Sequence, residues 1–223
     1  MTSRNLVRLF MTTLVVGGLT TAIVGLIVRW NEMQPFFVGF QIGDILSALI
    51  WFIVMGFLFS AISQMGFFAY LTIHRFGIGI FKSVSLWNAV QVVLILFALF
   101  DLVYLRYDNF AKSGQSIIPF LVPAIILLAI GAVAAWYKMK QTNKQAFIPA
   151  LFFMVVVTIV EWVPVLRTNS KNWLFLMMFA LMACNAYQLL ILHKLNTQSE
   201  KERQERLKRK ANSPKKLTKK PSV

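Results

Sequence analysis

Apolar residues dominate the chain in six long runs, separated by short stretches of charged and turn-forming residues. The runs cover residues 7–28, 45–71, 84–105, 117–137, 146–166 and 173–192. A helix needs about 20 mostly apolar residues to cross the hydrocarbon core of a membrane. The runs show no strict alternation and are about twice as long as a membrane-barrel strand. The pattern therefore predicts an all-α, polytopic integral membrane protein built as a six-helix transmembrane bundle.

Composition supports this class and excludes a water-soluble globule. The 223 residues are 58% hydrophobic and 14% charged, with a mean hydropathy of +0.67, whereas a soluble domain is roughly 45–50% apolar. We expect a membrane domain over residues 1–195 and a basic tail over residues 196–223. A cleaved signal peptide is the alternative for the first run, but the run is long for one and no small-residue cleavage site precedes Arg29.

Positive charge is distributed unevenly along the chain. There are 23 Lys and Arg against 8 Asp and Glu, a net charge of +15, and residues 194–223 hold 11 of the basic side chains. With the N-terminus inside, 18 basic residues face the cytoplasm and five face the other side. Loops rich in Lys and Arg stay on the cytoplasmic side of a membrane. We therefore expect a multi-pass protein of a bacterial cell membrane with both termini in the cytoplasm.

Small residues recur at four-residue intervals in two of the predicted spans. Gly17, Thr21 and Gly25 share one face of the first span, and Gly56 and Ser60 share one face of the second. This spacing lets two helices approach closely inside a membrane. We interpret it as packing within the bundle.

Charged side chains coincide in depth at the predicted outer ends of the spans. The acids are Asp44, Asp101 and Glu161, and the bases are Arg29, Arg106 and Arg167. One interpretation is a layer of ion pairs and anchors at the helix ends, where long side chains reach the interface. The other is a ligand or partner site at the outer face, because ionisable residues in membrane helices often serve function.

A second polar layer is predicted nearer the cytoplasm. Its members are Gln64, Asn88, Gln91, Asn185 and Gln188. Such amides usually form hydrogen bonds between membrane helices, so we interpret the layer as packing. A proton or ion path normally uses a carboxylate or histidine near the middle of the membrane, and this reading of the spans places none there.

The residues that carry most enzyme chemistry are sparse. Cys184 is the single cysteine, and the two histidines, His74 and His193, are far apart in the sequence. We interpret His74, which precedes Arg75, as a loop residue. We predict no catalytic residues, no metal site and no cofactor, and hence a protein that is not an enzyme. The alternative function is a small-solute transporter or channel that uses the outer carboxylates, and an enzyme acting on lipid ranks third because no nucleophile is found.

The tail has a composition of its own. Ser199 and Glu202 match a capping box, and favourable charge pairs follow, so residues 199–211 are predicted to form a solvated helix. The Lys, Pro and Ser content beyond Asn212 favours disorder. We expect contact with anionic membrane lipids or an acidic partner through Lys208, Arg209, Lys210, Lys215, Lys216, Lys219 and Lys220. No specific nucleic-acid binding is expected, because aromatic platforms are missing.

The N-terminal region resembles a known family. The sequence has Ser3-Arg4-Asn5, then Val7-Arg8-Leu9-Phe10, a Gly17-Gly18 pair, and Arg29-Trp30 at the end of the first span. With six spans in about 200 residues, this is similar to the KinB-signalling pathway activation protein family, KbaA, of spore-forming bacteria. The resemblance implies a membrane accessory protein that activates a KinB-type sensor histidine kinase feeding the sporulation phosphorelay. It implies no catalytic residues.

Overall fold

The structure is a computed structural model that describes the backbone of residues 2–212 and the side chains of residues 2–208. The regular elements of this part of the chain are all helical. They are α1 (Ser3–Val28), α2 (Trp30–Val38), α3 (Ile42–Phe81), α4 (Val84–Phe110), α5 (Ile118–Gln141), the 3-10 helix η1 (Lys144–Ala146), α6 (Phe147–Phe152), the π-helix η2 (Phe153–Val157), α7 (Thr158–Leu166) and α8 (Lys171–Asn212).

Six helical segments are long and apolar enough to cross a membrane. Four are the single helices α1, α3, α4 and α5, the fifth is the run η1–α6–η2–α7, and the sixth lies in α8. The predicted all-α class and the number of long apolar helices are confirmed. The structure adds α2, a short helix in a segment predicted as a loop.

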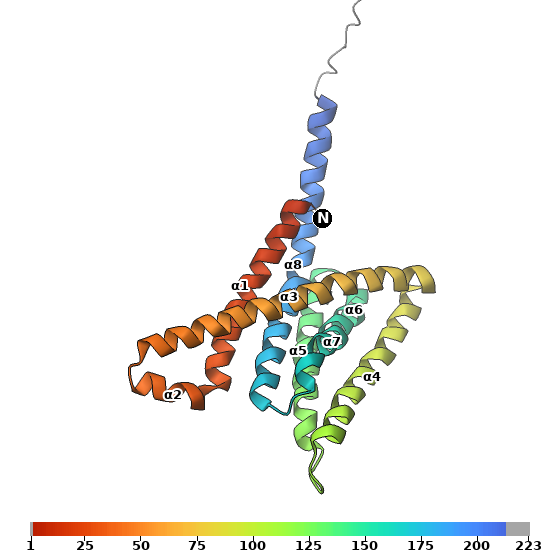
Figure 1. The fold of residues 1–223 in the computed structure, drawn as a ribbon. Coiled ribbons are helices and arrows are strands. Elements are labelled where there is room, and N and C mark those ends of the chain that lie inside the picture. The colour runs from red at the N-terminus through yellow and green to blue at the C-terminus, as the bar shows by residue number, and fades with distance from the viewer. Residues whose placement is uncertain (1, 213–223) are drawn as a thin grey trace, which may run out of the picture.

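Figure 1 shows α1 and α8 side by side and α3 crossing them obliquely. Small residues permit this close crossing. A Cβ atom on Gly17 of α1 would lie 2.7 Å from the Gly56 carbonyl oxygen and 2.8 Å from Ser60 Cβ, both on α3. The predicted packing role of the small residues on α1 and α3 is confirmed.

Apolar side chains form the core between α3, α5, η2, α7 and α8. Trp162, Phe67 and Phe153 are almost completely buried there, and the Trp162 indole donates to the carbonyl of Leu174 at 3.1 Å. Large apolar side chains also cover the outside. On α1 they recur every four residues, at Val7, Met11, Val15, Leu19, Ile23 and Ile27, and each is exposed. An apolar outside of this kind suits a hydrocarbon solvent.

The fifth apolar segment is an irregular helix. Pro149 lies in the first turn of α6, where its missing N–H leaves no bond broken. The next five residues form η2. A π-turn holds an extra residue, which shifts the face that the following residues present. As a result Thr158 and Glu161 of α7 are buried inside the bundle.

Two helices run beyond their predicted spans. The second run was predicted to end at residue 71, but α3 continues to Phe81. The interpretation of His74 as a loop residue is therefore wrong: its ring lies half-buried on α3 and accepts a hydrogen bond from the Trp87 indole. The helix predicted over residues 199–211 is present, but it is the continuation of α8. Ser199 does not begin a helix, because α8 passes through it.

Candidate functional site

A cluster of buried polar side chains joins three helices inside the bundle. Ser63 lies on α3, Thr158 and Glu161 lie on α7, and Asn185 and Gln188 lie on α8. Glu161 is 6% exposed and the other four are fully buried. Residues three apart share a helix face, so the pairs on α7 and α8 each point the same way. We call these five residues the polar cluster.

Hydrogen bonds in the polar cluster run in one direction and end on the carboxylate. Gln188 Nε2 donates to Ser63 Oγ at 2.6 Å, and Ser63 Oγ donates to Asn185 Oδ1 at 2.6 Å. Asn185 Nδ2 then donates to Glu161 Oε2 at 2.7 Å and to Thr158 Oγ1 at 2.9 Å. Asn185 is therefore the centre of the cluster and links α8 to both α3 and α7.

The second oxygen of the Glu161 carboxylate lies against bare backbone. Glu161 Oε1 is directly over Gly66 of α3, at the position that a Cβ atom would occupy. Among the described residues this oxygen has no hydrogen-bond partner, and no basic nitrogen lies within 4.0 Å of the carboxylate. The acid is thus held by one amide and by close packing, without a counter-charge.

Glu161 is not where the helix ends suggest. It precedes Arg167 by six residues, or about 9 Å along the axis, and it was therefore grouped with the outer charges. The structure instead places its carboxylate on Asn185, which lies about 18 Å along α8 from Trp173. The carboxylate contacts the inner polar residues. Two features account for this: the π-helix η2, which precedes α7 and shifts the face that Glu161 presents, and the length of the glutamate side chain. Sequence analysis did not predict this contact between Glu161 and the inner polar residues.

Three of the predicted outer residues meet at one cavity. Asp101, Arg106 and Arg167 line a space of about 740 Å³ between α4 and α7. Arg106 Nη1 donates to the carbonyls of Leu166 at 2.9 Å and Thr168 at 3.4 Å, so the guanidinium caps the C-terminal end of α7. No ion pair joins Asp101 to either arginine in the described part of the chain.

The other outer residues lie elsewhere. Arg29 pairs with Glu32 at 3.4 Å, and its guanidinium stacks over the rings of Trp51 and Trp173 at 5.5 and 5.7 Å. Asp44 is exposed in the first turn of α3. In the described part of the chain none of the six predicted residues forms an ion pair with another of the six, so they do not form one ion-paired layer.

The predicted inner layer divides into two groups. Asn185 and Gln188 belong to the polar cluster, and Gln64 Nε2 donates to Ser60 Oγ at 3.2 Å nearby. Gln91 instead lies 3.4 Å from the ring of His74, and the Asn88 carbonyl oxygen is buried without a partner among the described residues. Sequence reasoning missed Ser63, Thr158 and Gly66, although the three-residue spacing from Thr158 to Glu161 is a usable signal.

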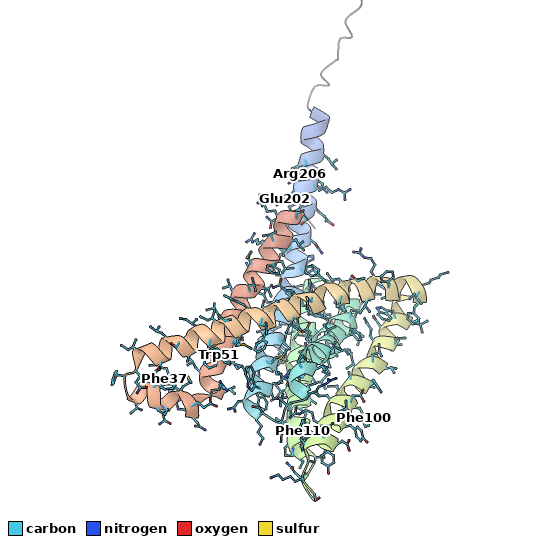
Figure 2. The ribbon with its side chains drawn as sticks, in the orientation of Figure 1. Phe37, Trp51, Phe100, Phe110, Glu202 and Arg206 are labelled. Carbon is cyan, nitrogen blue, oxygen red and sulfur yellow. The ribbon has the colours of Figure 1, made fainter. Side chains whose placement is uncertain are left out.

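The tail contacts the other end of the chain. Ser199 Oγ accepts hydrogen bonds from Asn5 Nδ2 at 2.9 Å and from the backbone N–H of Thr2 at 3.2 Å. Glu202 lies 3.9 Å from Arg4 across the same junction, and Figure 2 marks Glu202 on α8 beside the start of α1. Lys208 is exposed on α8. The side chains of Arg209, Lys210, Lys215, Lys216, Lys219 and Lys220 lie outside the described residues.

The polar cluster connects three helices through hydrogen bonds between side chains. The described residues contain no group of three or more His, Cys, Asp or Glu that could hold a metal ion. The four hydrogen bonds between cluster side chains each join α8 to α3 or to α7. Buried side-chain hydrogen bonds between membrane helices stabilise one arrangement of the helices that share them. Among the described residues, Glu161 Oε1 and Gln188 Oε1 are the cluster atoms left without a partner.

These features define the class of the protein. It has six long apolar helices, which fit a multi-pass membrane protein, and the polar cluster connects three of its helices. Residues 17–195 match the family described as KinB-signalling pathway activation in sporulation, KbaA. The chain is also 50% identical over 194 residues to the KinB-signaling pathway activation protein of Bacillus subtilis (strain 168), a match that covers 87% of this chain and 98% of that protein. No solved structure matches it. The chain belongs to the KinB-signalling pathway activation family, as the resemblance predicted.

Proposed function

We propose that this chain is an integral membrane protein that activates a KinB-type sensor histidine kinase feeding the sporulation phosphorelay. The observation that carries the proposal is the 50% identity to a relative named for activation of KinB signalling, over almost all of that relative's length. The second hypothesis from the sequence, a small-solute transporter, gains no support from this relative.

The proposed placement puts residues 1–195 in the cell membrane, with both termini in the cytoplasm. The excess of basic residues on that side supports this orientation. The basic tail, residues 196–223, would then lie against the anionic inner leaflet, where each Lys or Arg near the surface contributes about 1 kcal/mol.

The proposed mechanism is packing of this bundle against the transmembrane helices of the kinase, which shifts the kinase toward its active state. The polar cluster supports a bundle with one fixed arrangement of α3, α7 and α8, and hence a constant face for a partner. The other version is an outer-face site at Asp101, Arg106 and Arg167, which share one cavity.

The test of the proposed function is genetic. In a spore former whose phosphorelay is driven by one membrane kinase at a time, the gene for this chain is deleted and phosphorylation of the response regulator is measured. We expect output to fall with a single multi-span kinase and to recover with the intact gene. Unchanged output with every kinase would contradict the proposal.

The same assay separates the two versions of the mechanism. Asp101→Asn together with Arg167→Gln removes charge from the outer cavity and leaves the polar cluster intact. Loss of output from this variant, with normal amounts of protein in the membrane, supports the outer-face version. Full output supports packing.

A further inference from the structure

A small cavity lies at the end of the bundle where α3, α5 and η1 meet α8, and the sequence pattern does not predict it. Its volume is about 290 Å³. The polar side chains that line it are Tyr70, His74, Lys138, Asn143 and Gln145, and its apolar walls include Leu71, Leu189 and Leu192. No carboxylate lines the cavity.

Lys138 brings a buried positive charge to the cavity wall. The residue is 8% exposed, and its Nζ donates to the carbonyl oxygen of Leu189 at 2.7 Å. An ammonium has three hydrogens to donate, and in the described part of the chain no carboxylate lies within 4.0 Å of it. Burial of a charge without a counter-charge is costly. The cavity wall thus provides a cation, the Lys138 ammonium, that has no anionic partner in the described part of the chain.

Two of the other polar residues, His74 and Asn143, keep a donor, whereas the Tyr70 hydroxyl donates to the carbonyl oxygen of Pro149 at 2.9 Å. The Trp87 indole N–H donates to His74 Nδ1 at 3.1 Å. Since an indole nitrogen can only donate, Nδ1 must be the acceptor, and a neutral His74 carries its hydrogen on Nε2. Asn143 uses its oxygen to accept from the N–H of Ala146 at 3.0 Å, which leaves its NH₂ group to donate. Gln145 is exposed at the rim.

We infer that this cavity binds one small oxyanion of the phosphate type. Its walls are mainly apolar, and the polar residues among them include His74 on α3, Lys138 on α5 and Asn143 just before η1. In the described part of the chain, Lys138 brings a buried ammonium without a counter-charge. The volume lies at the lower end of the range for ligand sites, about 300–1,000 Å³, which suits a single phosphate group. Lys138 is in the last turn of α5, close to the end of an apolar helix, which is the depth of lipid headgroups in a membrane. Free phosphate and the phosphate of an anionic phospholipid share this chemistry.

The first arm of the test uses inorganic phosphate and the full chain in neutral detergent. Thermal unfolding is compared in phosphate and in chloride at equal ionic strength. If phosphate binds, the wild-type midpoint rises by about 3 °C or more. Lys138→Met and Gln145→Glu remove the rise, because one deletes the cation and the other adds a repelling charge. The matched controls are Lys140→Met and Gln141→Glu, both exposed and outside the cavity, and they keep the rise.

The second arm replaces phosphate with vesicles of phosphatidylglycerol or phosphatidylcholine, and rests on the proposed membrane insertion. If phosphatidylglycerol stabilises the wild type and the two controls, but not Lys138→Met or Gln145→Glu, the site binds a lipid headgroup. If Lys138→Met does not fold, the rim variant Gln145→Glu decides either arm. A midpoint that responds to neither anion source, or responds equally in all five proteins, overturns the inference. Neither arm depends on a kinase, so its failure leaves the proposed function standing.

Discussion

At the scale of single residues, Glu161 fits between α7 and α3 only because residue 66 has no side chain. Its Oε1 lies where a Cβ atom on Gly66 would be, while its Oε2 accepts from Asn185. Close packing on one side and a hydrogen bond on the other fix the position of the carboxylate.

Replacement of Gly66 by Ala is expected to lower the free energy of unfolding by about 1–3 kcal/mol, because the new methyl group overlaps the carboxylate. Gly43→Ala on the same helix is the control, since a Cβ atom there meets nothing within 4 Å. The measurement is unfolding of the purified chain in detergent. In the double variant with Glu161→Ala the loss due to Gly66→Ala should shrink, and equal losses in both backgrounds would contradict the contact.

Asn185→Ala is expected to lower the free energy of unfolding by about 1–2 kcal/mol, because it leaves Ser63 and Glu161 without their shared partner. Asn172→Ala, on the same helix, removes only a solvent-exposed hydrogen bond to Glu32 and should change it by no more than about 0.5 kcal/mol. The same unfolding assay measures both. Similar values for the two variants would show that the polar cluster is not a lock.

The sequence predicts which residues are polar and intramembrane, but not which of them meet. Glu161 was placed by its distance from a helix end, which assumes a regular helix and a short side chain. The helix is not regular, because the π-helix η2 precedes α7. The side chain is not short, because glutamate reaches Asn185 of α8. Lys138 was counted only as a cytoplasmic charge, since burial against Leu189 of another helix leaves no local trace in the sequence.

At the scale of elements, α1 and α8 form a pair that extends past the other helices (Figure 1). The runs of apolar residues predict that both helices exist and roughly where they lie. They do not predict that α8 continues through Ser199 to Asn212. Within that continuation, Ser199 contacts residues 2–5, almost 200 positions away in the sequence, which the runs do not predict either.

Ser199→Ala is expected to increase amide hydrogen exchange in the first two turns of α1, because Asn5 and the N–H of Thr2 lose their acceptor. Thr197→Ala is the control: its hydroxyl is exposed and bonds only within α8, to the carbonyl of His193. Hydrogen exchange followed by mass spectrometry gives the comparison. Unchanged exchange at residues 3–9 would mean that this junction does not hold the end of α1.

At the scale of the whole molecule, hydropathy and charge predict the number of spans and an orientation. Six apolar helices with short connections leave few arrangements, which explains why the fold class could be predicted. The oblique course of α3 could not, because the small residues Gly17 and Gly56 predict a close approach of two helices but neither the partner helix nor the crossing angle. The proposed topology is open to a direct test because Cys184 is the single cysteine and is buried.

In a Cys184→Ser background, Ser116→Cys is expected to react with a membrane-impermeant maleimide on intact cells, because residue 116 lies between α4 and α5 on the proposed outer side. Gln141→Cys, at the other end of α5, should react only after the cells are opened. Mass tagging of the purified protein gives the labelled fraction. Labelling of Gln141→Cys but not Ser116→Cys on intact cells would invert the topology.

The most direct test of the central claim is the autophosphorylation rate of a KinB-type kinase in lipid vesicles, with and without this chain at the same kinase density. If the chain activates the kinase by contact within the membrane, the rate rises by about fivefold or more, as expected for a coupling between two states. An unrelated six-helix protein in place of this chain should leave the rate unchanged. The same rate with this chain as without it would contradict direct activation.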